Sequence, residues 1–509
     1  MKCTNNLSTH LVLIILLFII PFSVMAQEDK RPNVLFIAID DINDWIGPLG
    51  GHPQAITPNI DKFCNEGAVI FNNAVCAAPI CGPSRSANLS GFMPNRTGVY
   101  GNATNMIYTD LVKENATLPE YFSKNGYHTL SNGKIFHKHA TENGVDFGHW
   151  AFDEHARARR YVKDSPNQKK LYSAKGGVID GVKDEAYKSK AKLSWGPTKK
   201  DFNETVDYKV AQWTKEQLQK EFDQPFFMAV GLIKPHLPWF VPQEFFDKYD
   251  LDTIQTPEVK EDDLMDITKK DGTPLFHPTK EYQWIKKHGL EKEATRAYLA
   301  NLTYADACLG IIFDALEKSG HADNTIIVIW GDHGWHLGEK QRYLKSTLWS
   351  EVTKTPFIVR TPQQKEMLYC SRTVSLIDMY PTLNALCGLP QKKEIDGHDF
   401  SSLLENPSNN WEYPGVTVSV DGTSVMTEEW HYIHYLSGVS ELYDIQKDPM
   451  EWHNLIEEPQ YEKIVKSLHQ WVPKQRTKAQ RIHYKKPKNY VDAPSDPTIK
   501  ANRDINKLK

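Results

Sequence analysis

The sequence predicts an α/β fold, in which a large, mostly parallel sheet is flanked by helices. Continuous apolar runs at Val34–Ile39, Phe226–Ile233 and Thr325–Trp330 indicate strands that are buried on both faces, as parallel strands are. An amphipathic helix at Glu293–Lys318 comes directly before the third run, and Gly320 is placed to end it. Helices that alternate with buried strands are typical of parallel sheets.

The pattern changes near residue 410. A further amphipathic helix, Ser375–Leu386, is predicted before that point. Short strand-like segments follow, separated by turn residues: Gly415–Val420, Ser424–Met426, His431–Tyr435 and Glu441–Tyr443. They predict a smaller C-terminal α+β subdomain with a short antiparallel sheet. We therefore divide the chain into residues 1–26, 27–410 and 411–509, the last with a basic tail, and expect a surface insertion at residues 154–204.

Composition limits the class of protein. The 509 residues suit one large domain and a smaller one, and 40% hydrophobic with 24% charged residues exclude wholesale disorder and a polytopic membrane protein. Sixty basic against 64 acidic side chains give a net charge of −4, so we expect no nucleic-acid partner. Seven cysteines are too few for a disulfide scaffold, and no pairing is assigned.

Residues 1–26 have the pattern of a secretory signal peptide. Lys2 precedes the apolar stretch Leu11–Ile20, and Val24-Met25-Ala26 supplies small residues for cleavage. An N-terminal anchor that is kept is the alternative, although the apolar stretch is short for a membrane span. No later segment approaches 18 apolar residues, so we expect no membrane span in the mature chain and an exported protein, periplasmic or secreted.

Acidic residues follow two of the predicted strands. Asp40 and Asp41 come at the carboxyl end of the first, and Asp332 and His333, between two glycines, follow the third. Ligands of open α/β sheets bind at the carboxyl ends of strands, and carboxylates suit a divalent cation. Each pair alone is often only a turn or a helix cap. Two such pairs at two strand ends favour a metal site.

The segment Cys81-Gly82-Pro83-Ser84-Arg85, followed by Leu89-Ser90-Gly91, resembles the signature of the type I sulfatases. In that family the cysteine is converted to formylglycine (3-oxoalanine), whose hydrated aldehyde is the nucleophile. The resemblance covers roughly residues 31–460 and implies an alkaline-phosphatase-like fold. Further segments resemble the family pattern: Thr57-Pro58-Asn59-Ile60-Asp61, Thr117–Phe122, Leu442-Tyr443-Asp444 and Asp448-Pro449.

Within the family the chain is most similar to the iduronate-2-sulfatase-like group. Gly133–His137, with Lys134 first among its polar residues, resembles that group's basic segment, and Lys234-Pro235-His236-x-Pro238 resembles its second histidine segment. His333 stands where many sulfatases have asparagine, which again matches this group. The histidine leaves the identity of the ion open, because Ca²⁺ prefers oxygen ligands.

The resemblance implies a role for each of these residues. Asp40, Asp41, Asp332 and His333, with residue 81, would hold one divalent cation, Ca²⁺ in the family. Lys134 and Lys345 would bind sulfate oxygens, and Arg85 would orient the aldehyde hydrate, although both lysines are also compatible with an ordinary surface position. His236 would protonate the leaving alcohol. His137, for which His139 is the alternative, would take a proton from the second hydroxyl and so release sulfate.

The expected activity is removal of sulfate esters from sugars of a sulfated acidic polysaccharide, either an algal glycan such as ulvan or a glycosaminoglycan. The expected partners are that sulfated oligosaccharide and a formylglycine-generating maturation enzyme. Lys234, Lys340 and Arg342 are candidates to contact an anionic sugar. Two alternatives stay open: a phosphoester or phosphonate hydrolase of the same superfamily, and a non-catalytic protein that binds sulfated glycans.

Overall fold

The structure is a computed structural model that describes residues 31–137, 139–141, 144–146, 148, 151–156 and 193–479. The described residues from Arg31 onward form one compact unit. The expected signal peptide, most of the expected insertion and most of the basic tail lie outside the described residues. The division at residues 410 and 411 stays a prediction.

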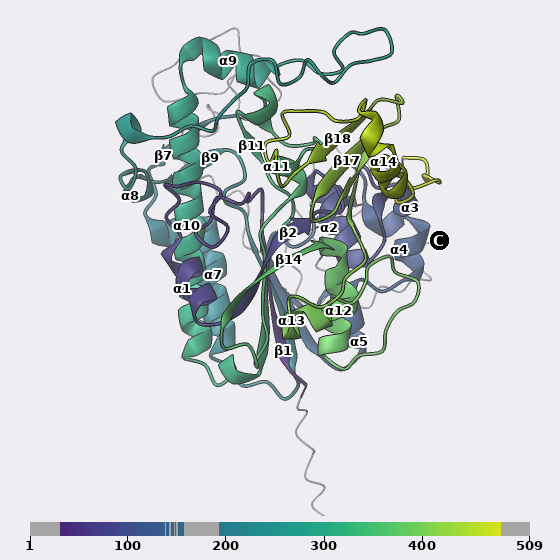
Figure 1. Ribbon diagram of the computed structural model, residues 1–509. Coiled ribbons are helices and arrows are strands. Elements are labelled where there is room, and N and C mark those ends of the chain that lie inside the picture. Colours follow the sequence, from purple (N-terminus) through teal and green to yellow (C-terminus); the bar gives the residue numbers. More distant parts are fainter. Residues whose placement is uncertain are drawn as a thin grey trace, which may run out of the picture. The chain divides into compact units, whose positions relative to one another are not determined.

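A mixed sheet of eight strands forms the centre of the described unit, as the apolar runs predicted (Figure 1). Its pairings are parallel except where β13 joins β10 and β2. Across the sheet the strands are β14 (Met367–Ser375), β2 (Ala68–Val75), β13 (Phe357–Arg360), β10 (Thr325–Gly331), β1 (Asn33–Ile39), β8 (Phe226–Leu232), β3 (His128–Gly133) and β6 (Glu154–Ala156).

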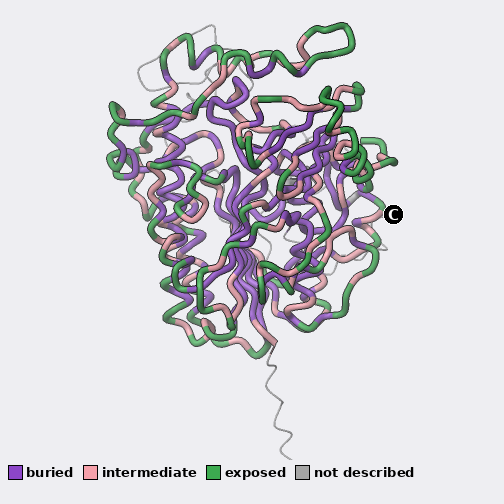
Figure 2. Tube along the Cα trace, in the orientation of Figure 1, coloured by how far each residue is buried: buried purple, intermediate pink, exposed green. Residues whose placement is uncertain are grey.

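Helices cover both faces of this sheet, which explains why the strands are apolar without alternation (Figures 1 and 2). On β1, Leu35 and Ile37 pack into the core on one face, and Val34 and Phe36 pack into the core on the other. The first face is covered by α1 (Pro58–Asn65), α7 (Val206–Leu218) and α10 (Glu291–Glu317). The second is covered by α2 (Cys81–Ser90), α5 (Leu118–Lys124), α12 (Met379–Leu386) and α13 (Ser401–Glu405).

The expected helix at Glu293–Lys318 is confirmed as α10, shifted by two residues at its start. By length and composition it is the one helix within the described ranges that would suit a membrane span, but 83% of its apolar window is buried inside the protein. The helix expected at Ser375–Leu386 begins later, at Met379, because Ser375 ends β14 and a 3-10 turn follows.

The short C-terminal strands form a separate antiparallel sheet of four, as expected. They are β15 (Gly415–Val418), β16 (Gly422–Met426), β17 (Trp430–Tyr435) and β18 (Ser440–Asp444), followed by α14 (Glu462–His469). This sheet contacts the segment that follows β2 through backbone, since the Val418 N–H donates to the Ala77 carbonyl at 2.9 Å. The C-terminal sheet therefore lies beside the segment that leads to Cys81.

The ends of the expected surface insertion belong to the body of the protein, which corrects part of that expectation. Glu154–Ala156 forms β6 at the edge of the large sheet. At the other end, Leu193 and Trp195 are buried in the core, and Trp195 begins β7 (Trp195–Thr198), which pairs with β9 (Trp239–Pro242). The six cysteines within the described ranges are all buried and free, so no disulfide joins them.

The remaining described α-helices and strands lie outside these two sheets and the helices named above. They are α3 (Pro94–Thr97), α4 (Asp110–Glu114), α8 (Gln243–Phe246), α9 (Lys280–His288), α11 (Ser350–Thr353), β4 (His139–Thr141), β5 (Gly144–Asp146), β11 (His336–Leu337) and β12 (Tyr343–Leu344).

Candidate active site

Four neighbouring strands, β10, β1, β8 and β3, end at the same edge of the sheet and deliver most of the expected site residues. Ile39 at the end of β1 is in register with Gly331 on one side and Leu232 on the other. The residues that follow each strand are therefore brought together by the parallel pairing. They are Asp332 and His333 after β10, Asp40 and Asp41 after β1, His236 after β8, and Lys134 after β3.

Close packing between β3 and β8 brings Lys134 to this edge. Gly133 has a φ of +81°, and a Cβ there would lie 2.0 Å from the Gly231 carbonyl oxygen. A Cβ on Gly231 would lie 2.3 Å from the backbone of Lys134. Glycine at both positions thus allows the chain to turn across the strand end and direct Lys134 inward. Its ammonium contacts Asp40 Oδ2.

Arg85 joins the acidic residues of two strand ends. Its Nε donates to Asp332 Oδ2 at 2.7 Å, and its terminal nitrogen lies 3.3 Å from Asp40 Oδ1. All three side chains are fully buried. Burial alone would raise the pKa of Asp40, but the nearby Lys134, His236 and Arg85 outweigh it and hold that pKa well below the usual value. Asp40 is therefore an anion in the folded protein.

Asp41 is held in an unusual backbone conformation. Its φ is 63°, in the left-handed region that aspartate tolerates better than most residues. The Asp41 N–H donates to Asp332 Oδ1 at 3.1 Å, and the Tyr298 hydroxyl donates to the Asp41 carbonyl at 2.8 Å. Burial raises the pKa of Asp41, and Lys345 opposes this rise. The turn directs the side chain toward Cys81.

Cys81 is the first residue of α2 and lies among the other site residues. Its Sγ is 3.6 Å from Asp41 Oδ1, 3.3 Å from His333 Nε2 and 2.9 Å from Lys345 Nζ. Burial raises the pKa of this thiol to about 12 even though Lys134 and Lys345 favour the thiolate. An unmodified Cys81 is therefore a neutral thiol at physiological pH and a poor nucleophile.

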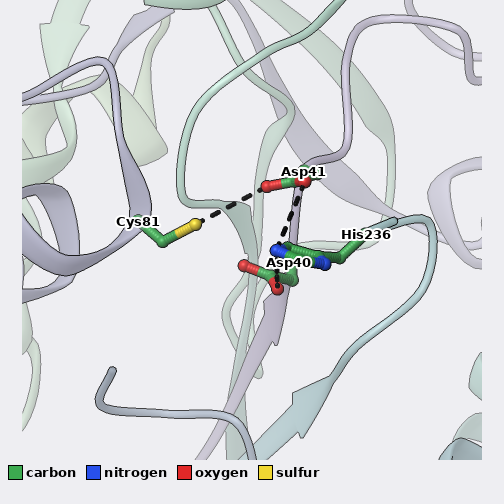
Figure 3. Close-up of side chains that lie close together, drawn as sticks. All are labelled: Asp40, Asp41, Cys81 and His236. Carbon is green, nitrogen blue, oxygen red and sulfur yellow. Dashed lines mark hydrogen bonds and ion pairs between the residues drawn. The ribbon is translucent and has the colours of Figure 1, made fainter. Parts of the chain in front are cut away.

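The imidazole of His236 lies beside the side chains of Asp40 and Asp41 (Figure 3). Its Nε2 lies 3.9 Å from Asp40 Oδ2 and 3.8 Å from Asp41 Oδ2. Its Nδ1 is 2.5 Å from the Leu237 carbonyl, which only accepts hydrogen bonds, so Nδ1 carries a hydrogen. The side chain is 25% exposed. An exposed edge next to buried anions suits a group that exchanges a proton with a bound ligand.

Lys345 and His137, the other two expected residues, do not directly follow a strand of the large sheet. Lys345, on the segment after β12, contacts Asp41 Oδ1 and is only 13% exposed, so it is not an ordinary surface lysine. His137 is half-buried and follows Lys134 closely in the chain. The side chain of His139, the alternative to His137, lies outside the described residues, so the choice between them stays a prediction.

Three residues that the sequence did not single out support the site. Asn102 Oδ1 accepts the Gly82 N–H at 2.7 Å, beside Cys81. Asp207, on α7, accepts the N–H groups of Ile233 and Lys234 at 3.0 and 2.9 Å and so holds the segment that carries His236. Tyr298 fixes Asp41 from α10, where its apolar spacing indicated only core packing. No motif marks such contacts, because they depend on the tertiary fold.

The residues present fit a divalent cation. Two groups of side chains place their ligand atoms within 4.8 Å of one another: Asp40, Asp41, Cys81 and His236, and Asp41, Cys81, Asp332 and His333. Asp41 Oδ2 is buried and accepts no hydrogen bond from the described part of the chain. Burial lowers the pKa of His333, and its Nδ1 lies 2.9 Å from the Gly334 carbonyl, which leaves the lone pair on Nε2.

One of the three expected contacts to an anionic sugar needs correction. Lys340 is buried, with its ammonium 2.9 Å from Asp263 Oδ1, so it is not available to a substrate. Arg342 packs its guanidinium against Phe276, 5.0 Å from the ring centre. The ammonium of Lys234 is 3.3 Å from the His236 carbonyl. Lys234 and Arg342 are half-buried, so their contact to a sugar stays a prediction.

Comparison with known proteins identifies the family. Residues 32–389 match the sulfatase family model, and residues 331–478 match the model for the C-terminal region of N-sulphoglucosamine sulphohydrolase. A sulfatase of Formosa agariphila is 35% identical over 457 residues, which cover 88% of this chain and 87% of that protein. The chain belongs to the sulfatase family and is a sulfuric ester hydrolase.

Two further relatives are similar over most of their length. The iduronate 2-sulfatase of Mus musculus is 26% identical, with 86% of this chain and 93% of that protein covered. An ulvan-active sulfatase of Formosa agariphila is 24% identical, with 93% of this chain and 87% of that protein covered. The chain is thus similar to sulfatases from an animal and from a bacterium.

Solved structures share the fold. A protein in complex with its substrate D-glucosamine-2-N,6-O-disulfate has a TM-score of 0.62 at 20% identity, covering 86% of this chain and 96% of that one. The phosphonate monoester hydrolase of Agrobacterium radiobacter has a TM-score of 0.68 at 19% identity, covering 86% and 94%. At such identities the likeness concerns the fold alone, which sulfatases and phosphonate hydrolases share.

Proposed function

We propose that this sulfatase removes sulfate from sugars of a sulfated acidic polysaccharide, using formylglycine at position 81 and one divalent cation, for which Ca²⁺ is the first candidate. The observation that carries the proposal is the environment of Cys81. Its neutral thiol lies within hydrogen-bonding distance of Lys345 and His333, beside Asp41, and begins a Cys-x-Pro-Ser-Arg segment. A buried neutral thiol is a poor nucleophile in spite of these neighbours, whereas a converted side chain would present hydroxyl groups to them.

The cation would be held by Asp40, Asp41, Asp332 and His333, together with the converted side chain of residue 81. A bound divalent cation supplies positive charge that neutralises sulfate oxygens and polarises the sulfur atom. Formylglycine at position 81 would supply, as its hydrate, a nucleophilic hydroxyl and a second hydroxyl through which sulfate could be released. Arg85 holds the carboxylates of Asp40 and Asp332 at a fixed spacing, since its planar group contacts both.

Two lysines would bind the sulfate group, and two histidines would transfer protons. Lys345 and Lys134 bind the sulfate oxygens that face them, as fixed positive charges in a largely buried site. His236, with hydrogens on both ring nitrogens, donates the one on Nε2 to the leaving sugar oxygen, while its Nδ1 hydrogen stays engaged by the Leu237 carbonyl. His137 takes a proton when sulfate is released.

The relatives support the substrate class. The printed names of two of them are iduronate 2-sulfatase and ulvan-active sulfatase, and both refer to sulfated acidic carbohydrates. We therefore propose oligosaccharides of a glycosaminoglycan or of an algal glycan such as ulvan as substrates. Sulfate release from depolymerised chains, intact polymer and simple sulfated monosaccharides tests this class. Strong turnover of steroid or lipid sulfates with none on acidic oligosaccharides would overturn the substrate but not the chemistry.

A comparison of aryl esters separates this proposal from its two alternatives. Turnover of matched aryl sulfate, phosphate and phosphonate esters should favour the sulfate ester. Preference for phosphonate would instead indicate a phosphonate hydrolase. Binding of sulfated oligosaccharides without turnover, by protein whose residue 81 is converted, would indicate a binding protein.

We also propose that the protein is exported to the periplasm or the medium. The support is the pattern of Lys2, the apolar stretch Leu11–Ile20 and the small residues that end at Ala26. Cell fractionation with N-terminal sequencing tests it. Protein that begins at Gln27 outside the cytoplasm is expected, and full-length protein in the cytoplasm would contradict export.

A further inference from the structure

Lys345 follows a short hairpin with an unusual backbone. The strands β11 and β12 pair through His336 with Leu344 and Leu337 with Tyr343. Several residues other than glycine adopt a positive φ along this segment, and two of them flank Lys345. They are Lys340 at 53°, Gln341 at 53°, Leu344 at 85° and Ser346 at 75°. Such conformations persist only where the surrounding structure holds them, so this hairpin requires support.

The tip of the hairpin is held by an ionic contact inside the protein. Lys340 is 2% exposed, and its Nζ donates to Asp263 Oδ1 at 2.9 Å and to the backbone carbonyl of Glu451. The ammonium also lies 5.7 Å from the ring centre of Trp349 and 5.4 Å from that of Tyr443. A buried cation with these partners fixes where the tip of the hairpin lies.

The chain after Lys345 is held by the same glutamate. Glu451 is 1% exposed, and its Oε2 accepts the Ser350 N–H at 3.0 Å at the start of α11. Its Oε1 contacts the Ser350 hydroxyl and His431 of β17. The neighbouring Trp349 donates its indole N–H to Glu441 Oε2 of β18 at 2.9 Å. Residues of the C-terminal sheet therefore hold the segment that follows Lys345.

The hairpin is also joined to the segment that carries the nucleophile. The Ser346 N–H donates to the Pro79 carbonyl at 3.0 Å, two residues before Cys81. Lys345 is thus fixed between the segment of Cys81 and the C-terminal sheet. Its ammonium contacts Asp41 and lies 2.9 Å from Cys81 Sγ.

We propose that Glu451 and Lys340 are positioning residues, through which the C-terminal sheet holds Lys345 against Asp41 and residue 81. The inference rests on the proposed function, in which Lys345 binds sulfate. Glu451 contacts the chain both before and after Lys345. Its backbone carbonyl accepts a hydrogen bond from Lys340, and its carboxylate accepts one from Ser350. A displacement of a catalytic group by about 1 Å costs roughly 100-fold in rate. Loss of this support should therefore reduce the contribution of Lys345.

A double-mutant cycle on the full-length, matured enzyme tests the inference. The variants are Glu451→Gln, Lys345→Met and the two combined, assayed for kcat and KM on an activated aryl sulfate. Glu451→Gln should lower kcat/KM by roughly 100-fold in the wild-type background, because Lys345 is displaced. In the Lys345→Met background the same change should cost less than about twofold, because the group that it positions is already gone.

Asp306→Asn is the matched control for stability. Asp306 is a buried carboxylate that accepts the N–H groups of Asn59 and Ile60, on the α1 and α10 side of the sheet. Its loss should lower the unfolding midpoint, yet change kcat/KM by less than about twofold in either background. Rates are compared per folded molecule, with the folded fraction measured by circular dichroism.

Milder variants serve if Glu451→Gln does not fold. Ser350→Ala removes one contact to Glu451, and Lys340→Met removes the charge at the tip, whereas Lys340→Arg keeps it. Lys340→Met should show the same dependence on Lys345, and Lys340→Arg should recover part of the activity.

Two results would overturn the inference. An equal loss from Glu451→Gln with and without Lys345 would mean that the network does not act through Lys345, while the proposed function would stand. Full activity of Lys345→Met would instead refute the role of Lys345 in the proposed function itself, and the positioning role with it.

Discussion

Arg85 and Asp332 lie 247 residues apart in the chain, yet Arg85 Nε donates to Asp332 Oδ2 at 2.7 Å in the interior of the protein. The same guanidinium lies 3.3 Å from Asp40 Oδ1 and donates to the carbonyls of Lys134 and Ile135. One side chain of α2 therefore joins the ends of β10, β1 and β3. The site depends on a planar cation that contacts several oxygens at once.

We predict that Arg85→Lys removes nearly all activity and destabilises the protein. An ammonium cannot span both carboxylates and the two carbonyls, and a buried charge left without its partner costs about 3–5 kcal/mol. Urea unfolding and aryl sulfate turnover measure both effects. Arg372→Lys is the control, because its partner Glu428 lies at the surface and such pairs contribute at most about 1 kcal/mol. Wild-type stability in Arg85→Lys would contradict this account.

Calcium should stabilise the protein through the aspartates. A ligand that binds only the folded state at 100 times its Kd adds about 2.7 kcal/mol, so Ca²⁺ should raise the Tm of chelator-treated protein and restore activity. Asp41→Asn should abolish both the shift in Tm and nearly all activity, whereas Asp306→Asn should keep the shift. Full activity of protein shown by elemental analysis to be free of metal would contradict the metal assignment.

Loss of His236 should depend on the leaving group. If its Nε2 proton is transferred to the departing oxygen, His236→Gln should slow release from a sugar, a poor leaving group, by about 100-fold or more. An activated aryl sulfate needs little protonation and should lose much less. His128→Gln, at a half-buried histidine beside Glu154, is the control. Equal losses on both substrates would argue against proton donation by His236.

Stability should change with pH through Asp306. Burial raises the pKa of this carboxyl to about 6, while hydrogen bonds from Ile60 and Asn59 oppose the rise. Because the folded state holds the proton more tightly than the unfolded state, the contribution of Asp306 to stability falls as pH rises from about 4 to about 6, and is constant above. A rise of about two pKa units corresponds to about 3 kcal/mol.

Urea unfolding of wild type and Asp306→Asn between about pH 4 and pH 8 measures this contribution. The advantage of the wild type over the variant should shrink across that range. Asp323→Asn, at an exposed position, should show a constant difference. A growing advantage of the wild type with rising pH would show that the pKa of Asp306 is lowered, not raised.

Residues that follow buried strands were the most predictable part of the site. Asp40 and Asp332 come directly after apolar runs that are in register in the sheet, so the pattern alone indicated that they meet. Lys134, His236 and Lys345 came from the resemblance to known sulfatases, because an isolated lysine or histidine carries no periodic signal. The helix Glu293–Lys318 was predictable because its apolar spacing is long and regular.

Contacts that do not follow from strand pairing were not predictable. Lys340 is polar and close to the catalytic segments in sequence. It is nevertheless buried, because its ammonium contacts Asp263 and Glu451, which come from other parts of the fold. Trp195 follows a polar stretch but pairs with β9 in the core. In each case the partner is remote in sequence, and tertiary packing outweighs local composition.

The most direct test of the account is the chemical state of residue 81 in active enzyme. Trypsin should release the peptide Phe63–Arg85, which also contains Cys64 and Cys76 as internal controls. In protein from a host that converts such cysteines, this peptide should be about 18 Da lighter, because a thiol becomes an aldehyde. Fragment ions should place the change at residue 81, and specific activity should rise in proportion to the converted fraction. Fully active enzyme that carries only unmodified Cys81 would contradict the account.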